Sequence, residues 1–190
     1  PNDPTTICIG SDDKTIRFLD TTRIEVSSIH KGHLDTPQTL YPFRNGVLSG
    51  GRDGKICFWD KRIENPAFSS SLKNGKIIIH ISSIIAPTDD LFISGDDQGK
   101  ILVWDPRSPE TPFFSVPVLK TENQTKNPIV NLSISPNSKM MAALMSNNTL
   151  NIFSLDGEWR YVSKQWPKIG TFFTRTCFSP DSKYIITVSG

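Results

Sequence analysis

The segment GGRDGKICFWDKR, residues 50–62, joins a glycine-rich turn to a short apolar run that ends in tryptophan, aspartate and, two places on, arginine. Its Asp-Gly pair favours a tight turn, and the apolar run after the turn predicts a strand. A second copy, GDDQGKILVWDPR, occupies residues 95–107, 45 residues further along the chain. The chain therefore contains an internal repeat.

The repeat extends over most of the sequence. Four aligned segments end at Asp20, Asp60, Asp105 and Ser154, with spacings of 40, 45 and 49 residues. Each segment joins two short apolar strands through a turn rich in Gly, Asp or Asn, which predicts a hairpin. Further strand-like stretches precede the hairpins, and no stretch has sustained helical periodicity. The sequence therefore predicts an all-β repeat protein.

A period of about 40–45 residues with four strands per unit is typical of WD-repeat propeller blades. The chain resembles this family in the Trp-Asp pairs at 59–60 and 104–105, and in the Gly32-His33 pair. The resemblance implies a WD-repeat β-propeller. Residues 1–190 are then part of a single propeller domain. We expect a partial ring of about four blades from a seven-bladed propeller, with missing blades on both sides. The expected blade fragments are 1–20, 21–60, 61–105, 106–154 and 155–190.

In this family a histidine, a strand serine or threonine, a turn aspartate and the strand tryptophan form a hydrogen-bonded tetrad. The resemblance assigns these structural roles to His33, Ser49, Asp53 and Trp59. A buried indole N–H and a buried imidazole both need partners, which gives the tetrad its physical reason. The other units depart from the pattern, with Gln98 at the turn aspartate and with Phe153 or Leu19 at the tryptophan.

Composition narrows the function. The formal net charge is only +2 and no dense run of Lys and Arg occurs, so neither nucleic acid nor a membrane is indicated as a direct partner. Cys8, Cys57 and Cys177 each lie in an apolar stretch, and we expect buried free thiols of a reducing compartment, nuclear or cytoplasmic. The sequence offers no convergent nucleophile, base or metal set, and no cofactor motif. An enzyme is therefore the third choice of function, and protein binding without a cofactor is the first.

Binding proteins of this kind use the loops on the two faces of the disk. The turn residues Asp12, Arg52 and Asp97 are expected to lie together on one face. They are candidates for a partner-binding face, and the alternative is ordinary polarity of solvated turns.

The sequence places two Asp-x-Arg motifs, Asp60 with Arg62 and Asp105 with Arg107, at the ends of strands on the opposite face. One interpretation is a local ion pair that fixes each turn, since exposed pairs contribute only about 0–1 kcal/mol to stability. The other rests on resemblance, because the motifs are similar to the Trp-Asp-x-Arg boxes of substrate receptors for cullin-4 RING ubiquitin ligases. In those receptors the box docks the propeller onto the damaged-DNA-binding adaptor protein.

Among such receptors, the pattern resembles the denticleless family, on the Gly-Gly-Arg-Asp-Gly segment, the two boxes in successive blades and the ending FFTRTCFSPDSKYIITVSG. The resemblance implies a receptor that binds the adaptor and cullin ligase and presents replication-linked substrate proteins, displayed on the DNA sliding clamp, for ubiquitination. The alternative is a general WD-repeat scaffold, for instance in chromatin or ribosome assembly, in which the Asp/Arg pairs are structural.

Overall fold

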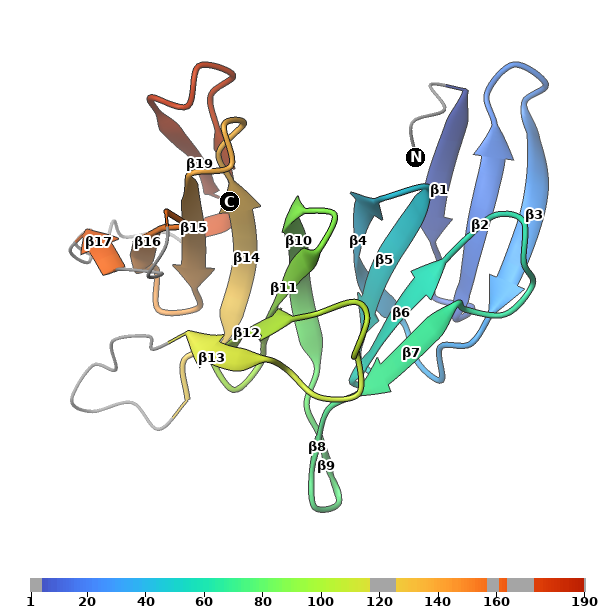
Figure 1. Ribbon diagram of the computed structural model, residues 1–190, viewed down its shortest axis with the longest axis horizontal. Coiled ribbons are helices and arrows are strands. Elements are labelled where there is room, and N and C mark those ends of the chain that lie inside the picture. Colours follow the sequence, from blue (N-terminus) through green and yellow to red (C-terminus); the bar gives the residue numbers. More distant parts are fainter. Residues whose placement is uncertain (1–4, 117–125, 157–160, 164–172, 190) are drawn as a thin grey trace.

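The computed structural model describes residues 5–116, 126–156, 161–163 and 173–189, and it confirms the all-β prediction (Figure 1). Three sheets have four strands each, and in every one the strands follow chain order with antiparallel neighbours. The first is β4 (Pro37–Phe43), β5 (Gly46–Gly51), β6 (Lys55–Trp59) and β7 (Phe68–Ser71). The second is β10 (Ile81–Thr88), β11 (Leu91–Asp96), β12 (Ile101–Trp104) and β13 (Phe114–Val116). The third is β14 (Ile129–Ile134), β15 (Met140–Met145), β16 (Leu150–Ser154) and β17 (Tyr161–Ser163).

Smaller sheets complete the described fold. β1 (Thr6–Gly10), β2 (Thr15–Asp20) and β3 (Glu25–Lys31) form a three-stranded sheet, which corresponds in the repeat to β5–β7. β18 (Phe173–Phe178) pairs with β19 (Ile185–Ser189). A short separate hairpin, β8 (Lys73–Asn74) and β9 (Ile77–Ile78), lies between the two sheets that carry the Trp-Asp pairs. These repeated antiparallel sheets are the arrangement expected of WD40 blades.

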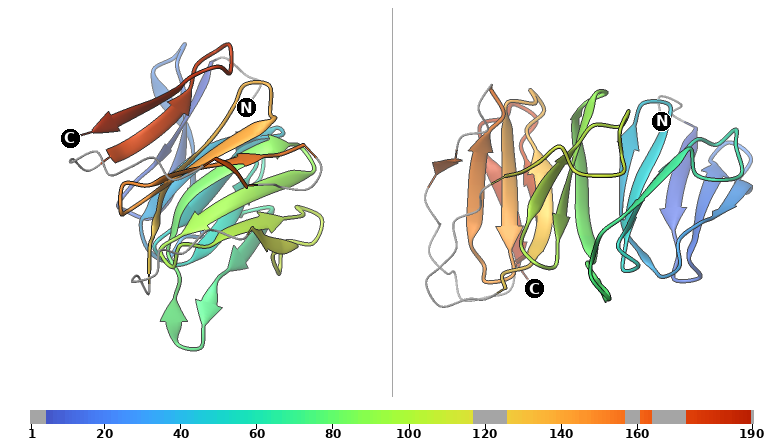
Figure 2. Two further views of the ribbon diagram at one scale, coloured as in Figure 1. Left: turned by 90° about the vertical axis from the view of Figure 1, so that its left-hand side faces the viewer. Right: turned by 60° about the horizontal axis from the view of Figure 1, so that its bottom comes forward.

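The sheets lie next to one another in chain order along an arc (Figures 1 and 2). The first strands of successive sheets are in contact, β4 with β10, β10 with β14 and β14 with β18. The later strands fan outward from this inner row (Figure 1). Each of the three four-stranded sheets therefore packs against the sheets on both sides of it, as the blades of a propeller do.

Polar side chains join the inner strands at regular positions. The backbone N–H of Ile84 donates to Thr39 Oγ1 (3.3 Å), that of Leu132 to Ser83 Oγ (2.9 Å), and that of Thr176 to Asn131 Oδ1 (2.9 Å). Each acceptor follows a register shift in its own strand. A bulge turns a side chain out of the normal alternation, and here it brings a polar group to the next sheet.

The hydrophobic core lies between the sheets. Leu48 and Ile56 pack with residues of the following sheet, and Phe92 stacks on Trp104 with ring centroids 5.8 Å apart. Trp59, Trp104 and Phe153 are all completely buried. The repeat therefore keeps a large ring at the end of the third strand even where the tryptophan is replaced by phenylalanine.

The burial of the cysteines differs from expectation. Cys57 is buried and Cys8 half-buried, but Cys177 on β18 is exposed, so the prediction of three buried thiols is wrong for Cys177. Cys57 faces the adjoining sheet and packs in one core cluster with Trp59 and Ile16. Cys177 belongs to the two-stranded sheet, and its side chain has no such cover within the described residues.

Candidate interaction sites on the two faces

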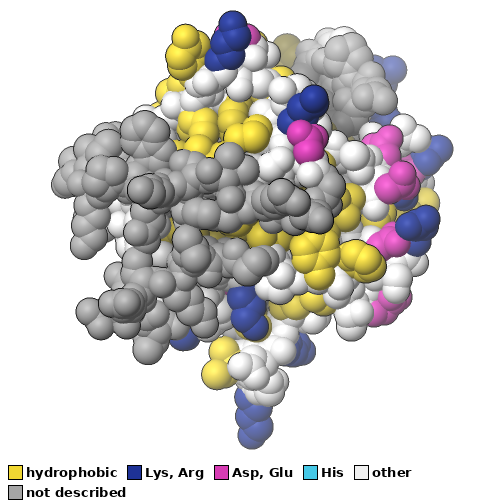
Figure 3. Space-filling model, turned by 60° about the vertical axis from the view of Figure 1, so that its left-hand side comes forward, with side chains coloured by type: hydrophobic (Ala, Val, Ile, Leu, Met, Phe, Trp, Pro, Cys, Tyr) yellow, Lys and Arg dark blue, Asp and Glu magenta, His cyan; other side chains and the backbone are white. Residues whose placement is uncertain are grey.

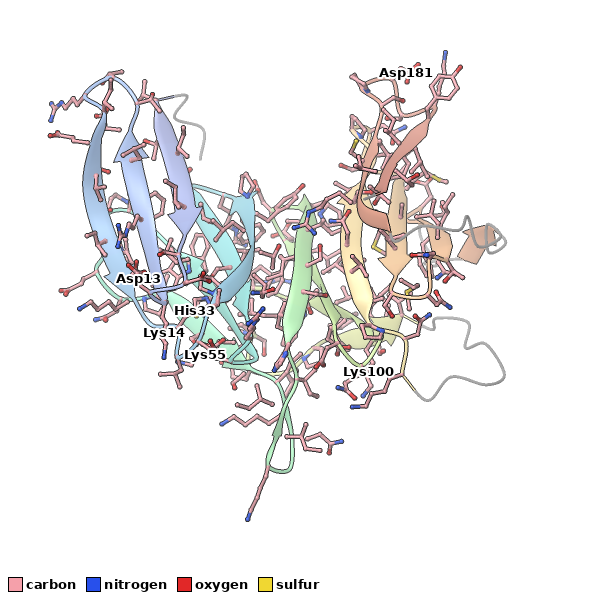
Figure 4. All side chains as sticks on the ribbon, turned by 180° about the vertical axis from the view of Figure 1, so that it is seen from behind. Asp13, Lys14, His33, Lys55, Lys100 and Asp181 are labelled. Carbon is pink, nitrogen blue, oxygen red and sulfur yellow. The ribbon has the colours of Figure 1, made fainter. Side chains whose placement is uncertain are left out.

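The turns of each sheet fall on two opposite faces, because successive strands are antiparallel. Turns between the second and third strands lie at one end, where Lys14, Lys55 and Lys100 are labelled in Figure 4. The turn that joins β18 to β19, marked by Asp181, lies at the other end (Figure 4). We call the first end the hairpin face, since β8 and β9 also lie there, and the second end the Asp-Arg face.

The structure places the four residues of the predicted tetrad in one buried chain of hydrogen bonds. His33 Nδ1 lies 3.0 Å from Asp53 Oδ2, His33 Nε2 lies 2.6 Å from Ser49 Oγ, and Trp59 Nε1 donates to Ser49 Oγ at 2.7 Å. Because a carboxylate only accepts, Nδ1 carries the imidazole proton, and Nε2 accepts from the Ser49 hydroxyl. The ring nitrogens of His33, the Ser49 hydroxyl, the Asp53 carboxylate and the Trp59 indole N–H are therefore all paired within the tetrad.

Electrostatics and space both fit this arrangement. Burial raises the pKa of the Asp53 carboxyl, but hydrogen bonds from His33 and from the backbone N–H groups of Leu34 and Lys55 outweigh it and lower the pKa below its ordinary value. A Cβ on Gly51 would lie 2.7 Å from Asp53 Oδ1 and 2.9 Å from His33 Nδ1. The tetrad consequently requires glycine at position 51.

The next sheet keeps the tryptophan–serine half of this hydrogen-bonded tetrad and replaces the histidine–aspartate half. Trp104 Nε1 donates to Ser94 Oγ at 2.9 Å, but Gln98 stands at the turn aspartate. Asp96, at the position that corresponds to Gly51, accepts from the backbone N–H groups of Gln98 (2.9 Å) and Lys100 (2.8 Å). Its side chain therefore performs the turn-fixing role that Asp53 has in the preceding sheet. The alignment of the repeats showed an aspartate at position 96, but its role was not predicted.

Asp96 is electrostatically unlike Asp53. It is completely buried, and its Oδ2 has no hydrogen-bond partner within the described residues. Burial raises the pKa of Asp96, and the hydrogen bonds from Lys100 and Gln98 only partly oppose that rise. The two sheets thus hold one carboxyl that favours ionisation and one that resists it.

The two Asp-x-Arg motifs have the same geometry in adjacent sheets. Arg62 Nε donates to Asp60 Oδ1 at 2.9 Å, and Arg107 Nε donates to Asp105 Oδ1 at 2.9 Å. In each motif the arginine backbone N–H also donates to the same aspartate, at 3.0 Å and 2.9 Å. A terminal guanidinium nitrogen adds a second side-chain contact. Each aspartate therefore fixes both the turn and the direction of its arginine.

These pairs are strongly polarised yet exposed. The side chains of Arg62 and Arg107 are 71% and 73% exposed. Side-chain and backbone hydrogen bonds from the arginine lower the pKa of Asp60 to about 2, and those from Arg107 lower the pKa of Asp105 to about 2. Both motifs stay ionised at physiological pH and present an oriented guanidinium to solvent.

A contact that the sequence did not predict links the two sheets on the Asp-Arg face. Arg44, in the turn after β4, donates through Nε to the backbone oxygen of Asp89 at 2.8 Å and lies 4.0 Å from Asp90 Oδ1. The charge of Arg44 also lowers the pKa of Asp105, after the larger contribution of the Arg107 hydrogen bonds. A pocket of about 430 Å³ lies between these two turns, lined by Pro42, Phe43, Arg44, Ala86, Pro87, Thr88 and Asp89.

On the hairpin face, the structure places Asp12, Arg52 and Asp97 in equivalent turns of three sheets. Asp12 and Arg52 are exposed, and Asp97 is half-buried. Asp97 Oδ2 lies 3.7 Å from His80 Nδ1, so the Asp97 carboxyl already has a neighbour within the protein. Arg52 is held through its backbone N–H, which donates to Thr36 at 3.0 Å, and its side chain is accessible to a partner.

Metal binding, thiol ionisation and membrane crossing can each be considered for the described residues. No group of three or more His, Cys, Asp or Glu side chains among them could hold a metal ion. Burial raises the pKa of the Cys8 thiol to about 12 and that of the Cys57 thiol to about 11, which disfavours the reactive thiolate. None of the described segments forms a helix of the length and apolarity that crossing a bilayer requires.

Comparison with known proteins bears on the fold and, more coarsely, on the function. Residues 25–60 match the WD domain, G-beta repeat. The chain is 24% identical to the LST8 homolog protein of Drosophila melanogaster over an alignment of 151 residues, and the match covers 77% of this chain and 45% of the relative. It is 23% identical to the lethal(2)denticleless protein of the same species over an alignment of 178 residues, and the match covers 74% of this chain and 23% of the relative.

The chain spans less than half the length of each of these relatives. The sequence motifs suggested the denticleless family in particular. The two similarities are equally distant, so they support WD40 repeats and do not single out that family.

Proposed function

We propose that this WD40-repeat protein, a protein-interaction scaffold, serves as a substrate receptor of a cullin-4 RING ubiquitin ligase in cell-cycle or DNA-replication control. In this proposal Asp60, Arg62, Asp105 and Arg107 bind the damaged-DNA-binding adaptor, and the hairpin face receives substrate proteins. The protein then acts in the nucleus and has no catalytic role of its own.

The observation that carries the proposal is the repetition of one exposed geometry in two adjacent sheets. Arg62 and Arg107 are each oriented by an aspartate two residues earlier, and each leaves most of its side chain in solvent. Exposed ion pairs add little to stability, so two identical pairs are poorly explained by folding alone. Planar guanidinium groups, in contrast, bind carbonyl and carboxylate groups well, and arginines are enriched among interface hot spots.

The pairing with aspartate favours binding in a second way. A free arginine loses much side-chain entropy when a partner immobilises it. Because Asp60 and Asp105 already hold the arginines, part of that loss occurs on folding. The Arg44 contact links the two adjacent sheets on the face where both motifs lie.

Similarity to the lethal(2)denticleless protein agrees with this proposal, but an equally distant similarity to the LST8 homolog favours a second candidate. In that candidate the chain is a general WD-repeat scaffold, and the Asp/Arg pairs only fix their turns.

The two candidates differ in the effect of the double substitution Arg62→Ala with Arg107→Ala. The receptor proposal expects co-precipitation with the purified adaptor to fall at least tenfold, since charge-assisted hydrogen bonds contribute about 1.5–3 kcal/mol each. Thermal stability is expected to change little because both side chains are exposed. Arg17→Ala is the matched control, as it removes an arginine paired with Asp13 on the hairpin face.

Unchanged adaptor binding by a folded double variant would favour the scaffold candidate. Unfolding of the double variant would show that the arginines are structural, and would also contradict the receptor proposal.

A further inference from the structure

The β8–β9 hairpin is a small element that projects from the hairpin face (Figure 1). Lys73 pairs with Ile78, and Asn74 pairs with Ile77, so only two residues form the turn. Gly75 occupies the first of these turn positions with φ +61°, a backbone conformation that glycine adopts readily. The connection from β7 to β10 has nine residues, 72–80, whereas the connection from β3 to β4 has five, 32–36. The hairpin is thus an added feature of one blade junction.

Its residues are exposed without exception. Every residue from Lys73 to Ile78 is exposed to solvent, and the exposed fractions of Ile77 and Ile78 are 60% and 44%. Figure 3 shows apolar and basic side chains projecting together at this end of the molecule. Scattered exposed isoleucines are common on proteins, but here two lie side by side in sequence on one projecting element. Ile78 borders the supporting turn, since a Cβ on Gly54 would lie 3.1 Å from Ile78 Cγ2, and Ile77 is the more exposed of the two.

The base of the hairpin is firmly attached to the best-formed repeat. The backbone N–H of Leu72 donates to Gly54 O at 2.9 Å, and Ile79 is buried. A Cβ on Gly54 would lie 2.7 Å from Leu72 O and 2.9 Å from Ile79 O, so the two segments are in close contact. Gly54 belongs to the turn that carries Arg52. The hairpin is therefore a fixed projection beside an exposed arginine.

The hairpin also has one sign of charge. Residues 72–79 include Lys73 and Lys76 and no acidic residue, and Arg52 on the supporting turn adds a third cation. Asp97 is an acidic group close to the end of this connection, since its Oδ2 lies 3.7 Å from His80 Nδ1. A ligand with acidic groups would be attracted here, and one with apolar groups would cover the isoleucines.

We propose that the β8–β9 hairpin is a docking element for a protein segment that carries both acidic and apolar side chains. A protein segment fits better than a nucleic acid, because the neighbouring turns of this face mix Asp12, Asp13 and Asp97 with Lys14, Lys55 and Lys100 and so offer no continuous basic track to an extended polyanion. It fits better than a membrane, because two isoleucines bury too little apolar surface for stable insertion.

This inference does not rest on the ligase proposal. The hairpin lies on the face opposite the Asp-Arg turns, so both surfaces of one molecule can be occupied at once. Within the ligase proposal the segment would belong to a substrate, and within the scaffold candidate it would belong to another partner.

The test is selection of a random fifteen-residue peptide library, displayed on phage, against the purified protein. Two variants then probe the selected peptides by fluorescence anisotropy, Ile77→Ser with Ile78→Ser and, separately, Lys73→Glu with Lys76→Glu. Matched controls on the Asp-Arg face are Ile24→Ser, whose side chain is 83% exposed in the β2–β3 turn, and Lys183→Glu. Thermal melts of all variants are expected to match the parent because the substituted side chains are exposed.

We expect enriched peptides with net negative charge and at least two apolar residues. Each double variant should weaken their binding at least tenfold, or about 1.4 kcal/mol, while the controls bind as the parent does. Raising salt from about 0.05 M to about 0.5 M should weaken binding further. The proposal is overturned if no peptide is enriched, if enriched peptides are basic or purely apolar, or if they bind the variants equally. Binding of the parent and the variants to phosphatidylserine vesicles is measured alongside. The proposal is also overturned if the substitutions weaken vesicle binding and leave peptide binding unchanged.

Discussion

Replacing Ser49 by alanine tests whether the buried tetrad is one connected hydrogen-bond network. The Ser49 hydroxyl is shared, since it donates to His33 Nε2 and accepts from Trp59 Nε1. Ser49 itself is completely buried, and the His33 side chain is 0% exposed. The substitution therefore leaves one acceptor and one donor without partners in a place that excludes water.

The chain supplies its own matched control. Ser94 occupies the corresponding position in the next sheet, is equally buried and accepts from Trp104 Nε1 at 2.9 Å. No histidine corresponds to His33 there. Ser94→Ala thus orphans one buried group, whereas Ser49→Ala orphans two. Since each such group costs about 1–3 kcal/mol, Ser49→Ala should destabilise the fold by about 1–3 kcal/mol more than Ser94→Ala.

Urea unfolding followed by tryptophan fluorescence measures both changes, because neither substitution removes a tryptophan. In a thermal melt, each kcal/mol should lower the midpoint by about 2–4 °C for a chain of this size. Equal effects of the two substitutions, within about 0.5 kcal/mol, would refute the reasoning, as would a larger effect of Ser94→Ala. Either result would mean that His33 does not depend on the serine.

Three further substitutions follow from the same turns. Asp53→Asn should cost about 1–3 kcal/mol at pH 7, because it weakens charge-assisted hydrogen bonds, whereas Asp96→Asn should be neutral or stabilising in the same denaturation assay. The raised pKa of Asp96 makes the parent lose stability as pH rises from the unfolded pKa of about 3.9 to the folded pKa, and the Asn variant should lack this loss in a pH series of unfolding curves. Gly54→Ala should destabilise by about 1–3 kcal/mol in the same assay, since the φ of +72° and the carbonyl oxygens of Leu72 and Ile79 exclude a side chain, and a neutral result would contradict this close contact.

The repeated sheets were predictable because their signals are local. Turn residues such as Asp53 and Gly54 and the short apolar strands beside them act within a dozen residues, and the 40–49-residue spacing then indicates the repeat. The partners of Trp59 followed from the family resemblance and from the rule that a buried indole N–H is paired.

The parts that were not predicted depend on contacts between sheets. Asp96 is an exception, because it accepts from Gln98 and Lys100 within its own turn, and a residue-by-residue alignment shows only the loss of the turn aspartate at Gln98. Arg44 contacts Asp89 across 45 residues, and nothing near Arg44 in the sequence indicates it. The exposure of Ile77 was equally hidden, since Ile79 and Ile81 in the same apolar stretch are buried.

Isothermal titration of the purified protein with the purified damaged-DNA-binding adaptor tests the central claim most directly. If the receptor proposal is right, we expect a saturable one-to-one complex that Arg62→Ala and Arg107→Ala each weaken and that the Arg17→Ala control leaves unchanged. Absence of a complex with the folded parent protein, or a complex indifferent to both arginines, would contradict it.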